Sequence, residues 1–301
     1  MKRDAYSLFG AAAVCGAALL LGSACMVTVG ADQYSVREEK RFTVNGTPDL
    51  SLATFDGSLE IRSWDRPEVL LEIEKRAGDK AQADSIVVTA EQTGNTIRLE
   101  IRRPVGRQMI GFKRSPSARV IASVPKRCNV VARSGDGSIA IERIEGTLDL
   151  NTGDGSIKGV DLAGSLRAHT GDGSLRFDNI SGAVDLDSGD GGARVSGALK
   201  SVRLKTGDGS VEVRAEDGSA MADDWEIRTG DGGLRLELPE HFSGNLDAST
   251  SDGDVRVDGF GDPTVGGRDE ESRRELRRAI GGGGKLLRLR SGSGSISVKR
   301  L

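Results

Sequence analysis

The sequence predicts an all-β protein, a single-domain parallel β-solenoid with about 18 residues and two short strands in each coil. The first observation is a Gly-Asp-Gly word whose aspartates recur at steps of 18 in the middle of the chain. The second is an alternation of apolar and polar residues after each word, which is typical of half-buried strands. The third is composition: glycine accounts for 42 residues and aromatic residues for only 4%, which favours a narrow, repetitive core.

The N-terminal segment, residues 1–31, is predicted to be a signal peptide, a lipoprotein signal or a membrane anchor. Two basic residues precede an uncharged run from Leu8 to Gly30, which is long enough to span a bilayer as a helix. The stretch LGSAC places small residues before Cys25, so Cys25 is a candidate for lipidation. Cleavage by ordinary signal peptidase a few residues later and retention as an uncleaved anchor are the alternatives. Each alternative places the rest of the chain outside the cytoplasm, at the cell envelope.

Residues 32–301 are predicted to form one domain, which begins with less regular coils over residues 32–133. This part contains an early relative of the repeat, TFDGSLEIR at 54–62, and a hairpin centred on residues 93–95. Cys128 is the only cysteine of the domain, so no internal disulfide can form there. We expect Cys128 to be a buried strand residue and not a nucleophile.

The regular repeats occupy residues 134–258, and each period of 18 divides into a Gly-Asp-Gly nine and a partner nine. Positions six and eight of every nine are apolar, for example Leu175 and Phe177, so these side chains are predicted to point inward and position seven outward. The partner nines carry a further apolar residue at position two, which we interpret as a second inward contact: Ile144, Leu162 and Ile180. Two strand faces would then enclose one thin core.

Position seven of the partner nines tests the stacking of one coil on the next, because its charge alternates in sign. Successive coils carry Asp149, Arg167, Asp185 and Arg203 at this position. Coils stacked in parallel register would place these side chains about 4.8 Å apart, with opposite charges adjacent. The alternation therefore favours a parallel stack over a meander of hairpins.

The Gly-Asp-Gly words are predicted to be structural corners without a cofactor or metal. Glycine would supply positive φ, the aspartate would bond nearby backbone N–H groups, and Thr or Ser at position one would join this network. A phosphate-binding G-x-G-x-x-G loop should open a helix, whereas each of these words opens a strand. Calcium remains the alternative, since repeated Gly/Asp nonapeptides form calcium-binding β-rolls. The corner aspartates are Asp136, Asp154, Asp172, Asp190, Asp208, Asp231 and Asp252.

The C-terminal part, residues 267–301, is predicted to contain one short helix and a final capping coil. Acidic residues precede arginines over residues 269–278, as the helix dipole favours, and Glu270 and Arg274 are spaced as an i, i+4 pair. Glycines 281–284 would end the helix. The final coil would contain a degenerate repeat, SGSGSISVK, from residue 291.

Three features together resemble the bacterial putative-adhesin family of cell-envelope proteins: RSWDRPEV at 62–69, the stacked [ST]-G-D-G-[SG] corners, and the ending RRELRRAIGGGGKLLRLRSGSGSISV. The resemblance implies a β-solenoid of toast-rack type, with no assigned domain function and no catalytic residues. We therefore expect a non-enzymatic envelope protein, a structural or adhesin-like binding module for envelope proteins or surface glycans. Similar proteins are associated with envelope-stress signalling, which is the alternative.

Two other function classes are disfavoured by composition. The formal net charge of −3 lacks the basic excess of a nucleic-acid-binding protein. A glycan-active enzyme would need carboxylates about 5–10 Å apart in a cleft, with aromatic side chains for sugar stacking. The chain has two Trp and two Tyr, and we expect Trp64 and Trp225 to be packing or corner residues.

Overall fold

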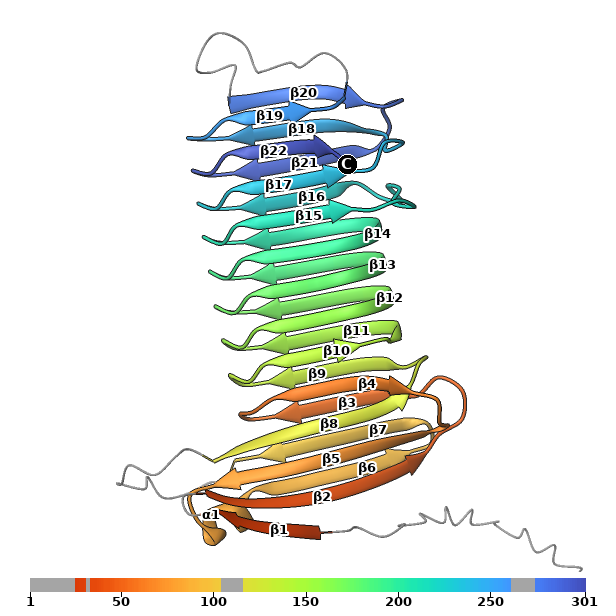
Figure 1. Cartoon of the computed structure of the whole chain (residues 1–301), viewed down its shortest axis with the longest axis vertical. Helices are drawn as coiled ribbons and strands as arrows, with labels where there is room; N and C mark the ends of the chain where they lie inside the picture. The colour runs from red at the N-terminus through yellow and green to blue at the C-terminus, as the bar shows by residue number, and fades with distance from the viewer. Residues whose placement is uncertain (1–24, 31–32, 104–115, 261–273) are drawn as a thin grey trace, which may run out of the picture.

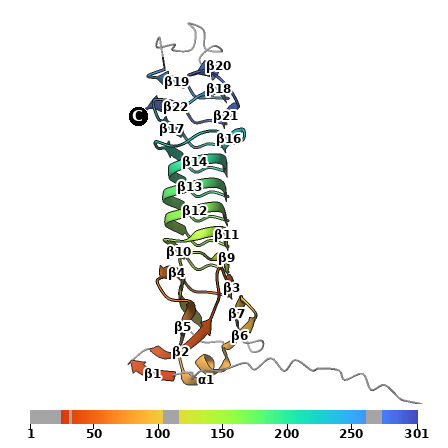
Figure 2. The same ribbon diagram turned by 90° about the vertical axis from the view of Figure 1, so that its right-hand side faces the viewer.

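The protein is all-β and elongated, with its strands stacked across the long axis of the body (Figure 1). The computed structural model describes residues 25–30, 33–103, 116–260 and 274–301. Within these ranges 22 strands belong to one hydrogen-bonded sheet, and the helix α1 spans Lys80–Ser85. Viewed from the side, the stack is narrow (Figure 2).

The middle of the stack follows the sequence period of 18. Strand β12 (Ile157–Thr170) pairs in parallel with β10 (Ile139–Glu142), β11 (Glu145–Thr152) and β13 (Leu175–Ser188), and β13 pairs in parallel with β14 (Ala193–Thr206). Register places Ile157 opposite both Ile139 and Leu175. We expected two short strands in each coil, but β12, β13 and β14 each run through both nines as one strand. In β12 and β13 the chain turns at Asp161 and Asn179, whose φ angles are 57° and 58°.

The C-terminal coil is inserted into the stack and does not cap it. Strand β21 (Leu286–Ser291) lies between β16 (Trp225–Thr229) and β18 (Gly244–Thr250). Strand β22 (Ile296–Arg300) lies between β17 (Leu234–Leu238) and β19 (Val255–Asp258). Above β14, the strand β15 (Val211–Ala215) links the regular coils to β17. The prediction of a final capping coil is therefore wrong.

Of the predicted C-terminal helix, Arg274 is helical, but the prediction is wrong over the residues that follow it. Residues Glu275–Ile280 form β20, which pairs antiparallel with β18. Ile280 is buried, and Arg277 binds Asp247 of β18 at 3.4 Å. Pairing with an otherwise open strand edge satisfies the backbone of β18, which outweighs the modest helix propensity of this segment. Residues 267–273 of the predicted helix lie outside the described residues.

The N-terminal end of the stack departs from the expected irregular coils, because several of its strands are antiparallel. Strands β1 (Cys25–Gly30), β2 (Gln33–Thr43), β5 (Glu68–Ala77) and β8 (Ser117–Pro125) pair antiparallel in that order. Strands β3 (Asp49–Thr54), β4 (Leu59–Trp64) and β9 (Asn129–Ser134) pair in parallel with their neighbours. The predicted hairpin is confirmed as β6 (Val87–Thr93) and β7 (Thr96–Arg102).

Two local features at this end were not anticipated. Helix α1 begins after Asp79, whose carboxylate accepts a hydrogen bond from the Gln82 N–H at 2.8 Å, as an N-cap does. Residues 25–30 are a strand, so this end of the predicted leader helix is wrong, and residues 1–24 and 31 lie outside the described ranges. Among the residues that are described, no helix is long and apolar enough to cross a membrane.

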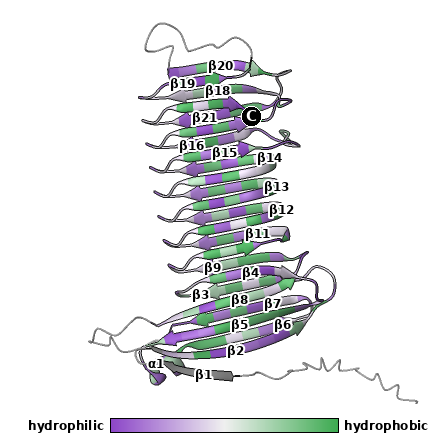
Figure 3. Ribbon diagram, viewed as in Figure 1, coloured by the Kyte–Doolittle hydropathy of each residue, from purple (hydrophilic) through white to green (hydrophobic). Residues whose placement is uncertain are grey.

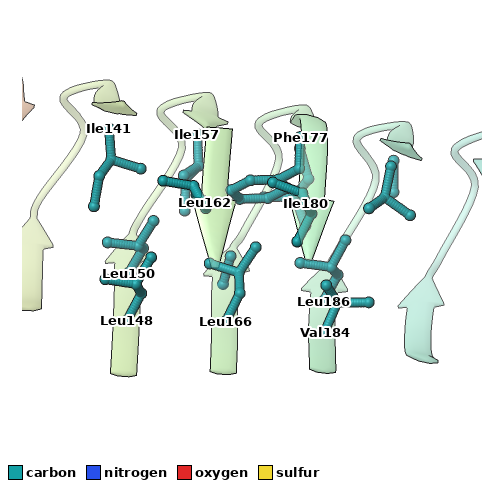
Figure 4. Packing of buried hydrophobic residues seen from close by; sticks show 14 of the residues in the cluster. Ile141, Leu148, Leu150, Ile157, Leu162, Leu166, Phe177, Ile180, Val184 and Leu186 are labelled. Carbon is teal, nitrogen blue, oxygen red and sulfur yellow. The ribbon is translucent and has the colours of Figure 1, made fainter. Parts of the chain in front are cut away.

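The main core is one continuous layer between the two strand faces, and a small second cluster of Val36, Ala77 and Ala83 lies at the N-terminal end. Ile157, Leu162 and Leu166 of a single coil point toward one another, and neighbouring coils repeat the arrangement (Figure 4). Hydrophobic and hydrophilic residues alternate along the strands (Figure 3). Every residue predicted to point inward at positions six, eight and two is buried, so the inward and outward assignment is confirmed.

The predicted charge ladder is present and is longer than expected. Asp149 lies opposite Arg167, Arg167 opposite Asp185, and Asp185 opposite Arg203. The same column continues in space, though not in sequence order, with Glu226, Arg288, Asp247 and Arg277. Alternating signs over eight strands favour this register, since adjacent like charges would repel.

Candidate functional site

The Gly-Asp-Gly corners stack on one another through a column of buried hydroxyl groups. Thr170 Oγ1 donates to the carbonyl of Gly155 in the preceding coil at 2.8 Å and accepts from the Gly173 N–H at 3.3 Å. Equivalent bonds to the preceding coil in space recur along the stack, from Ser134, Thr152, Ser188, Thr206, Thr229, Ser291 and Thr250. These hydroxyls satisfy backbone groups that water cannot reach. The expected role of position one is thus confirmed.

The corner glycines are required for close packing and not for positive φ. The glycines of the words at 135–137, 153–155, 171–173, 189–191 and 207–209 are absent from the positive-φ region of the backbone, so our prediction was wrong there. A Cβ atom added to Gly173 would lie 2.1 Å from the Gly155 carbonyl oxygen, and one added to Gly155 would lie 2.2 Å from that of Gly137. Each coil therefore needs glycine at these corners because the preceding coil leaves no room for a side chain.

All seven corner aspartates lie at exposed turns along one edge of the stack. Asp231 accepts a hydrogen bond from Ser293 Oγ at 2.9 Å, and Asp252 lies 3.8 Å from Arg274. Within the described residues no backbone N–H donates to any of the seven carboxylates, so the predicted capping role is wrong and the hydroxyls carry it. No group of three or more His, Cys, Asp or Glu in these residues is placed to hold a metal ion.

A shallow hollow of about 710 Å³, here the face hollow, lies over β13, β14, β15, β17 and β22. Small residues border it, including Gly192, Ser210 and Gly233. The adjacent outward column contains Arg176, which lies 3.6 Å from Asp178, and Arg194, which binds Glu212 at 2.5 Å. Because these charges are largely compensated, the surface offers an extended polar contact area without a strong field of one sign.

A second hollow of about 560 Å³, here the Trp64 pocket, lies at the edge of the stack opposite the Gly-Asp-Gly corners. At this point the N-terminal strands meet the regular coils. Five chain segments converge on it, and it is lined by Ser63, Trp64, Asp65, Lys126, Arg143, Glu145, Asp161, Leu162, Ala163, Asn179 and Ser181. Strand β4 supplies Trp64 at its end, and the corners of three successive coils supply the residues at 143, 161 and 179.

The polar groups of the Trp64 pocket are partly bonded to each other. Asn179 Nδ2 donates to Asp161 Oδ1 at 2.5 Å, and Lys126 Nζ lies 2.6 Å from Glu145 Oε1. The hydrogen bond from Lys126 holds the pKa of the Glu145 carboxyl below its usual range. Among the described residues, Asp65 and Asp161 form no ion pair. The pocket therefore presents two carboxylates without an ion pair, Asp65 and Asp161, beside the ion pair of Lys126 and Glu145.

The two tryptophans occupy different settings. Trp225 is fully buried and packs against Phe242 at 5.1 Å between ring centroids, so its predicted packing role is confirmed. Trp64 is half-buried, and its indole N–H donates to the Glu68 carbonyl at 2.8 Å. The Arg66 guanidinium lies 5.1 Å from the Trp64 ring centroid. Trp64 is a corner residue as expected, but sequence spacing gave no sign that Asp161 and Asn179 would join it.

Cys128 is buried immediately before β9. Burial, with a smaller contribution from Asp49, raises the pKa of its thiol to about 12. The prediction of a buried cysteine is confirmed, although the residue precedes the strand. A thiol held in its protonated form is a poor nucleophile.

Comparison with known proteins gives similar solved structures and a family. A putative cell adhesion protein from Clostridium sporogenes ATCC 15579 is 16% identical, with 88% of this chain and 99% of that chain covered and a TM-score of 0.30. A putative adhesin from Bacteroides fragilis NCTC 9343 is 11% identical, with 88% and 97% covered and a TM-score of 0.42. A putative lipid binding protein from Parabacteroides distasonis ATCC 8503 is 16% identical, with 88% and 96% covered and a TM-score of 0.37.

The search of curated proteins found no match. The model of one family, described as Toastrack DUF4097, matches residues 48–299, which is most of the chain. The protein belongs to the Toastrack DUF4097 family.

Proposed function

We propose that this protein is an exported, non-enzymatic binding module of the cell envelope, built as a β-solenoid with 18 residues in each regular coil. In this proposal residues 1–31 direct export and hold the chain at a membrane, through lipidated Cys25 or as an uncleaved anchor. The stack then presents binding surfaces away from that membrane. The buried, protonated thiol of Cys128 supports a role other than covalent catalysis.

The observation that carries the proposal is the position of β1 at one end of the stack and β20 at the other (Figure 1). From β7 to β20, successive strands pair in ten steps. At about 4.8 Å for each step, β7 and β20 are roughly 48 Å apart. An N-terminal anchor would therefore hold a narrow body by its end, which suits a protein that contacts partners at a distance from its membrane.

The hydroxyl column and continuous core support this role physically. Each coil contacts its neighbours through backbone pairs, buried hydroxyls and apolar side chains, so the body resists bending better than a chain of flexible modules would. Its outward faces can then hold several contact points at fixed spacing. Fixed spacing reduces the entropy lost when an extended partner binds.

The test is to locate the full chain, with a C-terminal tag, in the bacterium that encodes it and to capture what it binds. We expect the tag to be protected in intact cells or displayed at their surface, to fractionate with the envelope, and to retain envelope protein or glycan after mild cross-linking. A tag found in the cytoplasmic fraction would exclude the proposal. So would envelope localisation with no retained partner above a tag-only control.

A further inference from the structure

We propose that the Trp64 pocket binds a neutral saccharide unit of an envelope glycan. This inference rests on the proposed function and names the ligand class. Unlike the face hollow, it combines an aromatic side chain with polar groups from several chain segments. Its volume of about 560 Å³ lies in the range of small-ligand sites.

The Trp64 ring is held in place as an apolar wall. Its N–H is bonded to the Glu68 carbonyl, and Arg66 lies over one face of the ring at 5.1 Å, which leaves the other face for a ligand. A ring whose polar atom is already satisfied offers apolar area at little further cost in side-chain entropy. The C–H faces of a sugar ring are the complementary surface for such a wall.

The hydrogen-bonding groups favour a ligand that donates hydrogen bonds and carries no negative charge. Asp161 has one oxygen bonded to Asn179, which leaves its second oxygen and the Asn179 carbonyl as acceptors. Asp65 and Ser181 add further acceptors at the rim. Lys126 is engaged by Glu145, and Arg143 by Glu142 at 2.8 Å. Because the cations are paired and two carboxylates are not, the pocket disfavours an anionic ligand and suits sugar hydroxyls.

The backbone at the pocket keeps side chains where glycine would be less strained. Arg143, Asp161 and Asn179 have φ angles of 57°, 57° and 58°, which glycine adopts freely and other residues adopt at a cost. Asp and Asn tolerate this conformation better than most residues, because their short polar side chains can bond locally. Gly197 of the next coil instead pairs with Ile180 and has a different φ of 140°, so the left-handed corners that carry pocket side chains end with Asn179.

The experiment compares the full chain with three variants on a glycan array of neutral hexose, N-acetylhexosamine and deoxyhexose oligomers. Hits are then titrated, with tryptophan fluorescence as the readout, beside trigalacturonate and trilysine as anionic and cationic probes. Asp161→Gly and Asn179→Gly remove pocket side chains and relieve positive φ. Asp172→Asn, at an exposed corner on the other edge, is the matched control.

We expect at least one neutral oligosaccharide to bind and to change the fluorescence. Asp161→Gly and Asn179→Gly should each weaken binding tenfold or more while the melting temperature stays close to that of the wild type, and Asp172→Asn should bind like the wild type. Any of three results would overturn the inference: no binding to the array, equal binding by Asp161→Gly, or tighter binding of trigalacturonate or trilysine. None of these outcomes affects the proposed function, which the location and capture experiment tests separately.

Discussion

At the scale of single residues, the buried Thr and Ser hydroxyls hold adjacent corners together, while the aspartates that mark the repeat face solvent. Thr170 is completely buried and bonds both Gly155 and Gly173. Its hydroxyl therefore links two coils and one turn at once. The exposed Asp172, which lies between Gly171 and Gly173 in the sequence, forms no such link.

Thr170→Val tests this division of roles, because valine keeps the shape and removes the hydroxyl. Two buried backbone groups would lose their partner, so the free energy of unfolding should fall by about 1–3 kcal/mol. Thr147→Val, at an exposed site on β11, should change it by less than about 0.5 kcal/mol. Urea unfolding followed by circular dichroism measures both, and an equal effect from the two variants would contradict the assignment.

Gly173→Ala separates close packing from backbone conformation. Alanine is tolerated at ordinary negative φ, but its Cβ would lie 2.1 Å from the Gly155 oxygen. We expect a loss of about 3 kcal/mol or more in unfolding free energy. Gly233→Ala is the control, because its Cβ would have no neighbour nearer than 3.7 Å, and it should cost less than about 1 kcal/mol. Similar melting temperatures for the two proteins would refute the packing argument.

The exposed aspartates lead to a prediction about calcium. Asp172→Asn should change the unfolding free energy by less than about 0.5 kcal/mol, and a chelator should leave the melting temperature of the wild type unchanged. If the column bound calcium, calcium in large excess would instead stabilise the fold by a few kcal/mol. A chelator-induced fall in melting temperature that calcium restores and magnesium does not would show that the corners are a calcium site.

At the scale of strands, the end of the stack is closed by ion pairs as well as by backbone bonds. Asp247 of β18 binds Arg290 of β21 at 2.8 Å and Arg277 of β20 at 3.4 Å. Its side chain is 16% exposed, which makes it one of the more buried carboxylates of the surface ladder. The hydrogen bond from Arg290 is the main reason that the pKa of Asp247 is lowered.

A lowered pKa in the folded state means that Asp247 stabilises the fold above its unfolded pKa of about 3.9. This contribution is lost as the pH falls through the lower folded pKa. Asp247→Asn should therefore melt at a lower temperature than the wild type at pH 7, and the difference should shrink below about pH 4. Asp258→Asn, exposed on β19, serves as the control. A difference for Asp247→Asn that is independent of pH would rule out an electrostatic origin.

The strands also show where sequence reasoning succeeds and where it stops. The alternation at positions six and eight was sufficient to place the buried side chains, because one face of each strand must be covered wherever coils stack. Glu275–Ile280 was mistaken for a helix because its local charge pattern suits one. The segment forms a strand because it pairs with the open edge of β18. That edge exists only in the assembled stack and cannot be read from the local sequence.

At the scale of the whole molecule, the order of coils in space differs from their order in sequence. The last strands, β21 and β22, lie between strands that precede them in the chain. The coil formed by β18 and β19 therefore has no neighbour on the side that faces β16 and β17 until the C-terminal strands β21 and β22 are in place. A repeat period carries no information on such an exchange, because every coil offers the same pattern to its neighbours.

The Trp64 pocket was unpredictable for a related reason. Trp64, Asp161 and Asn179 are far apart in sequence and meet only because the N-terminal strands join the stack at that corner. The period of 18 does relate Asp161 to Asn179, which are neighbours in successive coils. It gives no indication that the end of β4 lies beside them.

The most direct test of the functional account is photo-cross-linking in living cells from two positions on the same coil. A diazirine-bearing amino acid replaces either Ser181, in the Trp64 pocket, or Asp172, exposed at the opposite edge of the stack. The account predicts that irradiation attaches carbohydrate-containing envelope material at position 181 and little at position 172. Equal attachment at both positions, or attachment mainly at position 172, would contradict it.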